Sequence, residues 1–256
     1  MNFKSFNFYP QIEAGIAEAG YETPTPIQER AIPPIMEGRD MLGLAQTGTG
    51  KTAAFALPIL QRLSKGRRRQ LRALIVSPTR ELAEQTHVAI TALGRKTGLR
   101  SVTLYGGVSQ LPQVKSLRAG VEIAVACPGR LLDLMKQRIV SLNHIEVLVL
   151  DEADQMFDMG FLPDIRRIVA DAPASRQTLL FSATMPKEIR SLADEQLHNP
   201  AVVEIGDSRP VETVSHAIYA VEATQKTSLL LELLYMAKSD KVLVFTRTKH
   251  RAKRLA

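Results

Sequence analysis

The chain has 256 residues, 45% of them hydrophobic, and a formal net charge of +7 at pH 7. This length allows one large domain or one and a half domains with a sizeable core, and the positive charge is compatible with polyanionic partners. The single cysteine, Cys127, excludes an internal disulfide framework and fits a reducing compartment. No apolar run is long enough to span a membrane and the N-terminus has no signal-peptide core, so we expect a cytoplasmic protein without membrane contact.

The N-terminal region contains a short helical pattern that Gly20 is predicted to end. Thr25 is placed to cap the next helix, with Pro26 at its first position. This structural interpretation is complete by itself. A functional alternative is that the amide of Gln28, which donates and accepts hydrogen bonds at once, reads the edge of adenine while Phe3 stacks on the base.

Residues 45–52, with the sequence AQTGTGKT, lie between a short apolar run and an apolar helical pattern. A strand, a glycine-rich loop and a Lys-Thr pair that opens a helix are typical of a phosphate-binding loop. The glycines let backbone N–H groups point at phosphate oxygens, and the helix N-terminus adds partial positive charge. Lys51 would reach the terminal phosphates, and the Thr52 hydroxyl would bind Mg²⁺. The predicted nucleotide-binding residues of this loop are Ala45, Gln46, Thr47, Gly48, Thr49, Gly50, Lys51 and Thr52.

Two segments also have a plainer interpretation. Ala45 occupies the position where the usual phosphate-binding loop begins with Gly, so residues 45–52 taken alone are also compatible with a turn before an ordinary helix. Residues 65–72 form a basic loop with the sequence KGRRRQLR. That loop is either simply solvated or contributes to nucleic-acid binding.

Apolar runs and helical patterns alternate along the rest of the first 200 residues. Apolar runs rich in Val, Leu and Ile occur at residues 73–76, 102–105, 121–126, 145–150 and 178–181, and helical patterns at 80–97, 109–119, 130–138, 161–170 and 186–197. Apolar strands without polar alternation indicate burial on both faces. The pattern therefore predicts an α/β fold, with a parallel sheet flanked by helices and with ligands at the carboxyl ends of its strands.

Three predicted strands end in loops that suit a phosphodiester backbone. Their glycines, hydroxyls, arginines and helix starts are groups that contact phosphates, and nothing nearby resembles a helix that reads bases. The expected contact is therefore with the backbone and independent of sequence. Each loop alone is also compatible with ordinary turn chemistry. The candidate residues are Pro78, Thr79, Arg80, Gly107, Pro128, Gly129 and Arg130.

The apolar run that ends at residue 150 is followed directly by acidic residues. A strand that ends in acids is typical of the second part of a nucleotide hydrolase site, beside the phosphate-binding loop. Asp151 would hold Mg²⁺ opposite the phosphate-binding loop, and Glu152 would orient or deprotonate the attacking water. The alternative is an acidic helix cap. Ser182 and Thr184 end the next apolar run, where their hydroxyls are expected to hydrogen-bond to Asp154 or its neighbours, or to cap the helix that follows.

Taken together, these ordered segments resemble the DEAD-box ATP-dependent RNA helicases, whose loop normally has Ala at position 45. The sequence around the acids, such as residues 158–161, is similar to that of the bacterial RhlE-like subgroup. The resemblance implies a RecA-like P-loop fold and the cofactors ATP and Mg²⁺. It also implies catalytic roles for Lys51, Asp151 and Glu152, and coupling roles for Asp154, Ser182 and Thr184. Cys127 departs from the family, which usually has Thr there.

The same resemblance predicts the domain organisation. We expect a Q-motif region at residues 1–30, the first RecA-like domain at 31–206, a linker at 207–213 and the start of a second RecA-like domain at 214–256. Strands are expected at 214–221 and 241–245, with a helix through about 237 between them.

The family's arginine-rich motif, expected in the second domain, does not occur in this sequence. A finger arginine is worth roughly 10³–10⁵ in rate in related phosphate-transfer systems. We therefore expect this chain to bind nucleotide, to hydrolyse it poorly by itself and to act within a longer RNA helicase. The alternative is a nucleotide-dependent RNA-binding module that never completes catalysis.

Overall fold

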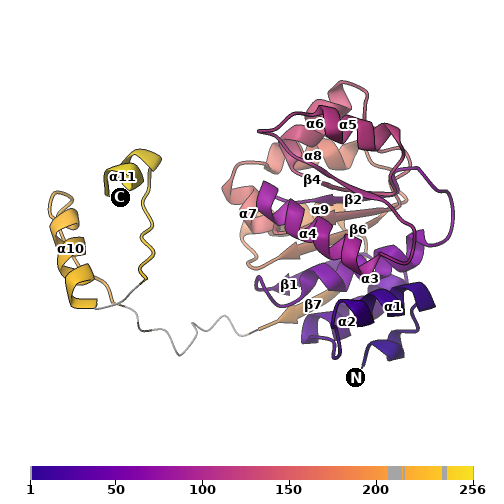
Figure 1. Ribbon diagram of the computed structural model, residues 1–256, viewed down its shortest axis with the longest axis horizontal. Coiled ribbons are helices and arrows are strands. Elements are labelled where there is room, and N and C mark those ends of the chain that lie inside the picture. Colours follow the sequence, from indigo (N-terminus) through magenta and orange to yellow (C-terminus); the bar gives the residue numbers. More distant parts are fainter. Residues whose placement is uncertain (1, 207–214, 216, 238–240, 256) are drawn as a thin grey trace. The chain divides into compact units, whose positions relative to one another are not determined.

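The computed structural model describes residues 2–206, 215, 217–237 and 241–255. The chain divides into two compact units, Met1–Asp207 and Ser208–Ala256, and each has its own internal contacts. Figure 1 shows the first unit as a sheet with helices on both of its faces.

A parallel sheet of seven strands forms the centre of the first unit, in the order β3-β4-β2-β5-β6-β1-β7. The strands are β1 Met41–Ala45, β2 Ala73–Val76, β3 Ser101–Leu104, β4 Ile123–Ala126, β5 Val147–Leu150, β6 Gln177–Ser182 and β7 Ala201–Ile205. The inner strands β2, β4, β5 and β6 are buried along their whole length, which explains their continuous apolar sequences. The predicted α/β fold with a parallel sheet is confirmed.

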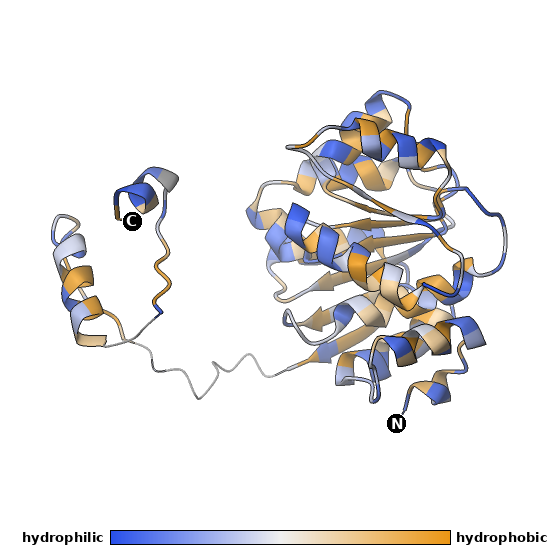
Figure 2. Ribbon diagram, viewed as in Figure 1, coloured by the Kyte–Doolittle hydropathy of each residue, from blue (hydrophilic) through white to orange (hydrophobic). Residues whose placement is uncertain are grey.

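Alternation of side chains along each strand divides the core between the two faces of the sheet. Ile75 and Val149 pack with α1–α4 on one face, whereas Val76 and Leu150 pack with α5–α9 on the other. Figure 2 shows the apolar strands enclosed between these helices. The helices of the first unit are η1 Phe3–Phe6, α1 Pro10–Glu18, α2 Pro26–Met36, α3 Lys51–Leu63, α4 Arg80–Leu93, α5 Leu111–Arg118, α6 Pro128–Lys136, α7 Ala153–Asp158, α8 Leu162–Ala170 and α9 Lys187–Gln196.

Besides the short helix η1, two elements of the first unit were not predicted from the sequence. Strand β7 is an edge strand whose side chains are mostly exposed or half-buried, and Glu204 interrupts its apolar sequence. It is held by its parallel pairing with β1, where Ala201 lies opposite Met41. Helix α7 has six residues and follows the acidic segment directly. Neither element carries a periodicity long enough to read from the sequence.

In the second unit, the structure describes α10 Lys226–Ala237 and α11 Lys249–Leu255. The predicted helix through about residue 237 is confirmed by α10. The predicted strand at 241–245 is wrong, since those residues form no strand and Phe245 is 87% exposed. A strand needs a partner for its backbone N–H and C=O groups, and the described residues provide none here.

The predicted strand at 214–221 is also absent from the residues of that range that the structure describes, 215 and 217–221. The predicted linker at 207–213 lies outside the described residues. Within the described ranges, every helix is too short or too polar to cross a membrane.

Candidate functional site

The loop between β1 and α3 has a backbone that requires glycine. Gly48 and Gly50 have φ angles of 87° and 96°, in the left-handed region that side chains with a Cβ rarely adopt. A Cβ on Gly50 would also lie 2.5 Å from Nε2 of Gln28. The loop therefore turns tightly before the N-terminus of α3, which begins at Lys51.

Lys51 is buried at the start of α3, where its ammonium group has two oxygen partners. Its Nζ lies 3.0 Å from Oε1 of Glu152 and donates a hydrogen bond of 2.9 Å to the carbonyl of Ala45. The Thr47 hydroxyl donates to the same Glu152 oxygen over 3.1 Å. The phosphate-binding loop and the acidic segment are thus in direct contact, and Thr52 follows in the first turn of α3.

The two acids that follow β5 lie in a buried and strained segment. Burial, and next the charge of Glu152, raise the pKa of Asp151 to about 7. Glu152 adopts left-handed backbone angles of φ 52° and ψ 54°, which are uncommon for a residue other than glycine. Backbone strain of this kind is typical of functional sites.

Asp154 connects the acidic segment to the end of β6. Its Oδ2 accepts hydrogen bonds of 2.8 Å from both the backbone N–H and the hydroxyl of Thr184, and its own N–H donates to the Ser182 hydroxyl over 3.2 Å. Partial burial acts to raise the pKa of Asp154, but these hydrogen bonds outweigh it and lower the pKa below its ordinary value. The predicted hydrogen bonds are present, whereas neither hydroxyl caps α9, whose N-cap residue is Pro186.

Gln28 connects α2 to the phosphate-binding loop. Its Oε1 accepts from the N–H of Thr25 over 2.9 Å, and its Nε2 donates to the carbonyl of Gly50 over 3.1 Å. One donor and one acceptor of the amide are left, which is what the edge of adenine requires. Thr25 is the N-cap residue of α2 and forms a capping box with Gln28, as predicted, and its hydroxyl oxygen is buried beside this loop.

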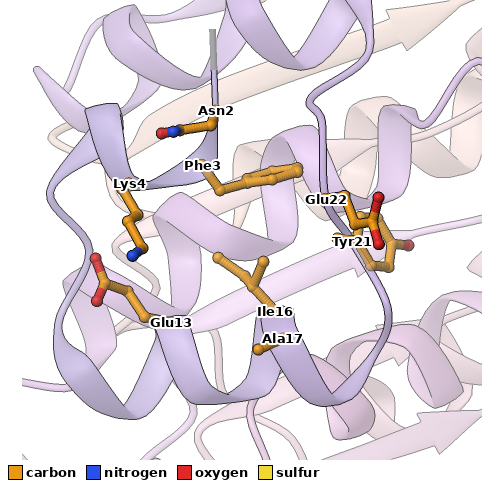
Figure 3. Close-up of a pocket in the computed structure, with 8 residues that line it drawn as sticks. All are labelled: Asn2, Phe3, Lys4, Glu13, Ile16, Ala17, Tyr21 and Glu22. Carbon is orange, nitrogen blue, oxygen red and sulfur yellow. The ribbon is translucent and has the colours of Figure 1, made fainter.

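Phe3 lines a pocket of about 280 Å³ at the N-terminal end of the domain. Figure 3 shows its ring above Ile16, with Tyr21 and Glu22 across the pocket. The ring centroids of Phe3 and Tyr21 are 6.0 Å apart, in an edge-to-face arrangement. Tyr21 was not predicted as a site residue, although an aromatic residue seven positions before Gln28 was visible in the sequence.

The loop after β2 presents Thr79 and Arg80 at the start of α4. The Thr79 hydroxyl accepts from the N–H of Leu82 over 3.3 Å and caps the helix. The Arg80 guanidinium lies 4.9 Å from the ring centroid of Tyr105, which follows β3. A side-chain hydrogen bond between Tyr105 and Glu84 lowers the pKa of Glu84 and raises that of Tyr105.

The buried side chain of Gln113 connects the loops after β3 and β4. Its Nε2 donates to the carbonyl of Tyr105 over 3.1 Å, and its Oε1 accepts from Arg130 over 3.0 Å. Arg130 also donates to the carbonyl of Val108 over 3.0 Å. Gln113 and Tyr105 were not predicted as site residues, because their role depends on contacts between separate loops.

The two glycines predicted to contact RNA leave open space in front of these loops. A Cβ on Gly107 or Gly129 would meet no atom within 4 Å. Pro128 is the first residue of α6, directly after Cys127, and the buried Pro78 precedes α4. Burial, and next the charge of Glu81, raise the pKa of Cys127 to about 11, so this thiol stays protonated.

The strand order brings the predicted residues to one edge of the sheet in two neighbouring groups. The carboxyl ends of β5, β6 and β1 are adjacent and carry the acids, the Ser182–Thr184 segment and the phosphate-binding loop. The carboxyl ends of β3, β4 and β2 are adjacent and carry the three loops predicted to contact RNA. Since β2 pairs with β5, the two groups adjoin.

Comparison with known proteins gives the same assignment. The family model described as DEAD/DEAH box helicase matches residues 25–192. The chain is 42% identical over 256 residues to the DEAD-box ATP-dependent RNA helicase CshA of Streptococcus pneumoniae, covering 100% of this chain and 49% of the relative. It is 41% identical over 255 residues to the DEAD-box ATP-dependent RNA helicase RhpA of Helicobacter pylori, covering 99% of this chain and 51% of the relative.

Among solved structures, a DEAD box protein from the hyperthermophile Methanococcus jannaschii matches with a TM-score of 0.76 at 33% identity. The match covers 100% of this chain and 69% of that protein. The chain spans about half the length of the curated relatives it matches. The family model alone covers more than half of the sequence. The chain therefore belongs to the DEAD/DEAH box helicase family.

Proposed function

We propose that this chain binds ATP with Mg²⁺, and RNA through its sugar–phosphate backbone, as part of an ATP-dependent RNA helicase. The observation that carries the proposal is the 3.0 Å contact between Lys51 Nζ and Glu152 Oε1. It joins a phosphate-binding loop to an acidic segment far away in the sequence, which is the pair of elements that nucleotide hydrolysis needs.

The residues of the loop and the acidic segment fit a magnesium nucleotide. Mg²⁺ keeps several waters and takes only one or two protein ligands, for which we propose Thr52 and Asp151. When bound, the ion would neutralise charge on the phosphates. Lys51 would exchange Glu152 for phosphate oxygens, and the backbone N–H groups of residues 46–50 would bind the remaining ones. Glu152, once released from Lys51, has a carboxylate able to accept a proton from water.

For the base, we propose the surface between η1 and α2. Phe3 and Tyr21 line the pocket there, and the remaining donor and acceptor of Gln28 suit the edge of adenine. Thr25 supports this placement, because its capping box with Gln28 fixes the orientation of that amide.

For RNA, we propose the loops after β2, β3 and β4. The N-termini of α4 and α6, the open space at Gly107 and Gly129, and the guanidinium groups of Arg80 and Arg130 suit phosphates. Contact with phosphates and sugars carries no base information, so binding would be independent of sequence. The full proposed set is Pro78, Thr79, Arg80, Gly107, Pro128, Gly129 and Arg130.

Coupling between the two ligands would pass through Asp154, Ser182 and Thr184, because their hydrogen bonds join the acidic segment to β6. The domain assignment also remains our proposal: a Q-motif region at 1–30, a first RecA-like domain at 31–206, a linker at 207–213 and the start of a second RecA-like domain at 214–256. A complete second domain would supply the arginine for efficient hydrolysis. The RhlE-like subgroup stays a prediction, and we propose the cytoplasm as the location.

The test is ATP turnover by the 256-residue chain with and without single-stranded RNA, beside a Glu152→Gln variant and direct measurement of nucleotide binding. We expect Mg²⁺-dependent nucleotide binding with turnover near background. RNA-stimulated turnover that Glu152→Gln abolishes would support the helicase proposal and contradict the need for a further domain. Absence of nucleotide binding by the wild-type chain would overturn the proposal.

A further inference from the structure

The edge of the sheet opposite the candidate site carries a concentration of arginines. The loops that precede β2, β3 and β4 lie side by side at the amino ends of these adjacent strands. The loop between α3 and β2 projects from the right-hand side of the domain in Figure 1 and is coloured hydrophilic in Figure 2. Four exposed arginines of these loops, here called the amino-edge arginine cluster, are Arg67, Arg68, Arg69 and Arg100.

A buried carboxylate holds two of these loops together. Glu122, which is 2% exposed, accepts one hydrogen bond from the backbone N–H of Arg69 and another of 2.8 Å from that of Arg100. The Arg68 guanidinium donates to the carbonyl of Thr97 over 3.1 Å, which adds a second link between the loops before β2 and β3. These hydrogen bonds join separate loops, so they hold the backbone segments that carry the cluster in a defined arrangement.

The cluster has little acidic compensation. No salt bridge joins any of its four side chains to a carboxylate within the part of the chain that the structure describes. The nearby carboxylate of Glu146 is already paired, with Arg72 at 2.6 Å and with Arg62 at 3.5 Å. Several unpaired like charges at one surface repel each other and gain stability from a polyanion.

The chemistry of the surface favours nucleic acid over protein. Protein interfaces bury aromatic and apolar side chains at their centre. Among the described residues, the large exposed hydrophobic side chains lie outside residues 62–72, 94–100 and 119–122. Arginine presents a planar fork of donors that matches phosphate oxygens, and three of the cluster's arginines are consecutive in the chain.

We propose that the amino-edge arginine cluster is a second binding surface for phosphodiester backbone, which holds single-stranded RNA that extends beyond the segment bound at the carboxyl edge. The choice of RNA rests on the proposed function. The surface is separate from the candidate site, since a four-residue strand spans about 13 Å and the two groups of loops lie at its opposite ends.

The experiment compares RNA binding by the 256-residue chain and by the R67Q/R68Q/R100Q variant, using single strands of about 6 and about 30 nucleotides across a range of salt. The matched control R30Q/R39Q/R167Q removes the same number of exposed charges outside the cluster. We expect the cluster variant to bind the long strand about tenfold more weakly at low salt, with a log–log salt dependence shallower by about 2. Binding of the short strand should change by less than about twofold.

The remaining outcomes separate the two proposals. Wild-type binding of both strands that the cluster variant retains would overturn the second surface and leave the proposed function intact. The same would follow if the control variant weakened long-strand binding as much as the cluster variant. Failure of the wild-type chain to bind either strand would overturn the proposed function, and with it the choice of RNA. Nucleotide binding by each variant checks that the domain remains folded.

Discussion

The ammonium of Lys51 and the carboxylate of Glu152 lie 3.0 Å apart and are both largely buried. The proposed chemistry needs each group for a different partner. Lys51 would bind phosphate oxygens, and Glu152 would accept a proton from water. Nucleotide binding must therefore break this ion pair, and the pair competes with the ligand for Lys51.

Removal of the charge on Glu152 should consequently tighten nucleotide binding. We expect Glu152→Gln to bind ADP about tenfold more tightly, because phosphate no longer competes with a carboxylate for Lys51. Titration with a fluorescent nucleotide measures this. Glu146→Gln is the matched control, since Glu146 is paired with Arg72 at the other edge of the sheet and its loss should leave nucleotide affinity unchanged. Weaker binding by Glu152→Gln would contradict the competition.

The raised pKa of Asp151 predicts a particular dependence of stability on pH. Because burial raises this pKa from 3.8 to about 7, the folded chain binds more protons at this carboxyl than the unfolded chain between those values. The contribution of Asp151 to the free energy of unfolding is therefore most favourable below about pH 4 and declines as the pH rises to about 7, after which it stays constant.

Asp151→Asn removes this titration. The stability difference between Asp151→Asn and wild type should grow in favour of the variant by a few kcal/mol between pH 5 and pH 8, measured by urea unfolding. Asp133→Asn, at an exposed position, should show a constant difference from wild type over the same range. A constant difference for Asp151→Asn as well would mean that Asp151 is charged throughout.

The contact between Arg80 and Tyr105 predicts an effect on RNA affinity. Tyr105→Leu removes the ring 4.9 Å from the guanidinium, and such a contact is worth about 0.5–1 kcal/mol at an exposed site. We expect RNA binding two- to fivefold weaker, read by fluorescence anisotropy, with nucleotide binding unchanged. Tyr105→Phe keeps the ring and should bind within about twofold of wild type. Equal affinity of Tyr105→Leu and wild type would show that Arg80 is held by other contacts.

Gln113 should matter for both stability and RNA binding. Gln113→Ala leaves the partly buried carbonyl of Tyr105 and one Arg130 donor without partners, at a cost of about 1–3 kcal/mol. We expect the midpoint of urea unfolding to fall and RNA affinity to drop several-fold. Gln110→Ala, which removes an exposed pairing with Gln137, is the control and should change neither. A loss of stability without a loss of RNA affinity would make Gln113 purely structural.

Much of the fold was predictable because its inner strands are buried on both faces. An uninterrupted apolar run such as residues 147–150 identifies such a strand, whereas the edge strand β7 contains Glu204 and was missed. The wrong strand at 241–245 has the same apolar composition, but composition alone does not supply a pairing partner. Local sequence therefore predicts strands best where the surrounding sheet makes burial complete.

The candidate site was predictable where its chemistry lies in one continuous segment. Residues 45–52 carry a loop, a helix start and a lysine together, so their spacing identifies them. The roles of Tyr105 and Gln113 arise from contacts between loops that follow different strands, and no local spacing encodes them. The ion pair between Lys51 and Glu152 likewise depends on the strand order, because the two residues follow different strands.

Gly15 gives a test of how the N-terminal helices support the pocket proposed for the base. In the interior of a helix, Gly→Ala ordinarily stabilises by up to about 1 kcal/mol. A Cβ on Gly15 would lie 2.0 Å from the backbone carbonyl oxygen of Leu93, which no side-chain rotation relieves, so α1 must shift away from α4. We expect Gly15→Ala to lower the free energy of unfolding by about 1–3 kcal/mol. Nucleotide affinity should fall with it, because α1 carries Ile16 at the wall of the pocket beside Phe3. Gly106→Ala, where a Cβ meets no atom within 4 Å, is the matched control. A stabilised Gly15→Ala variant would show that α1 is not packed against α4 in solution.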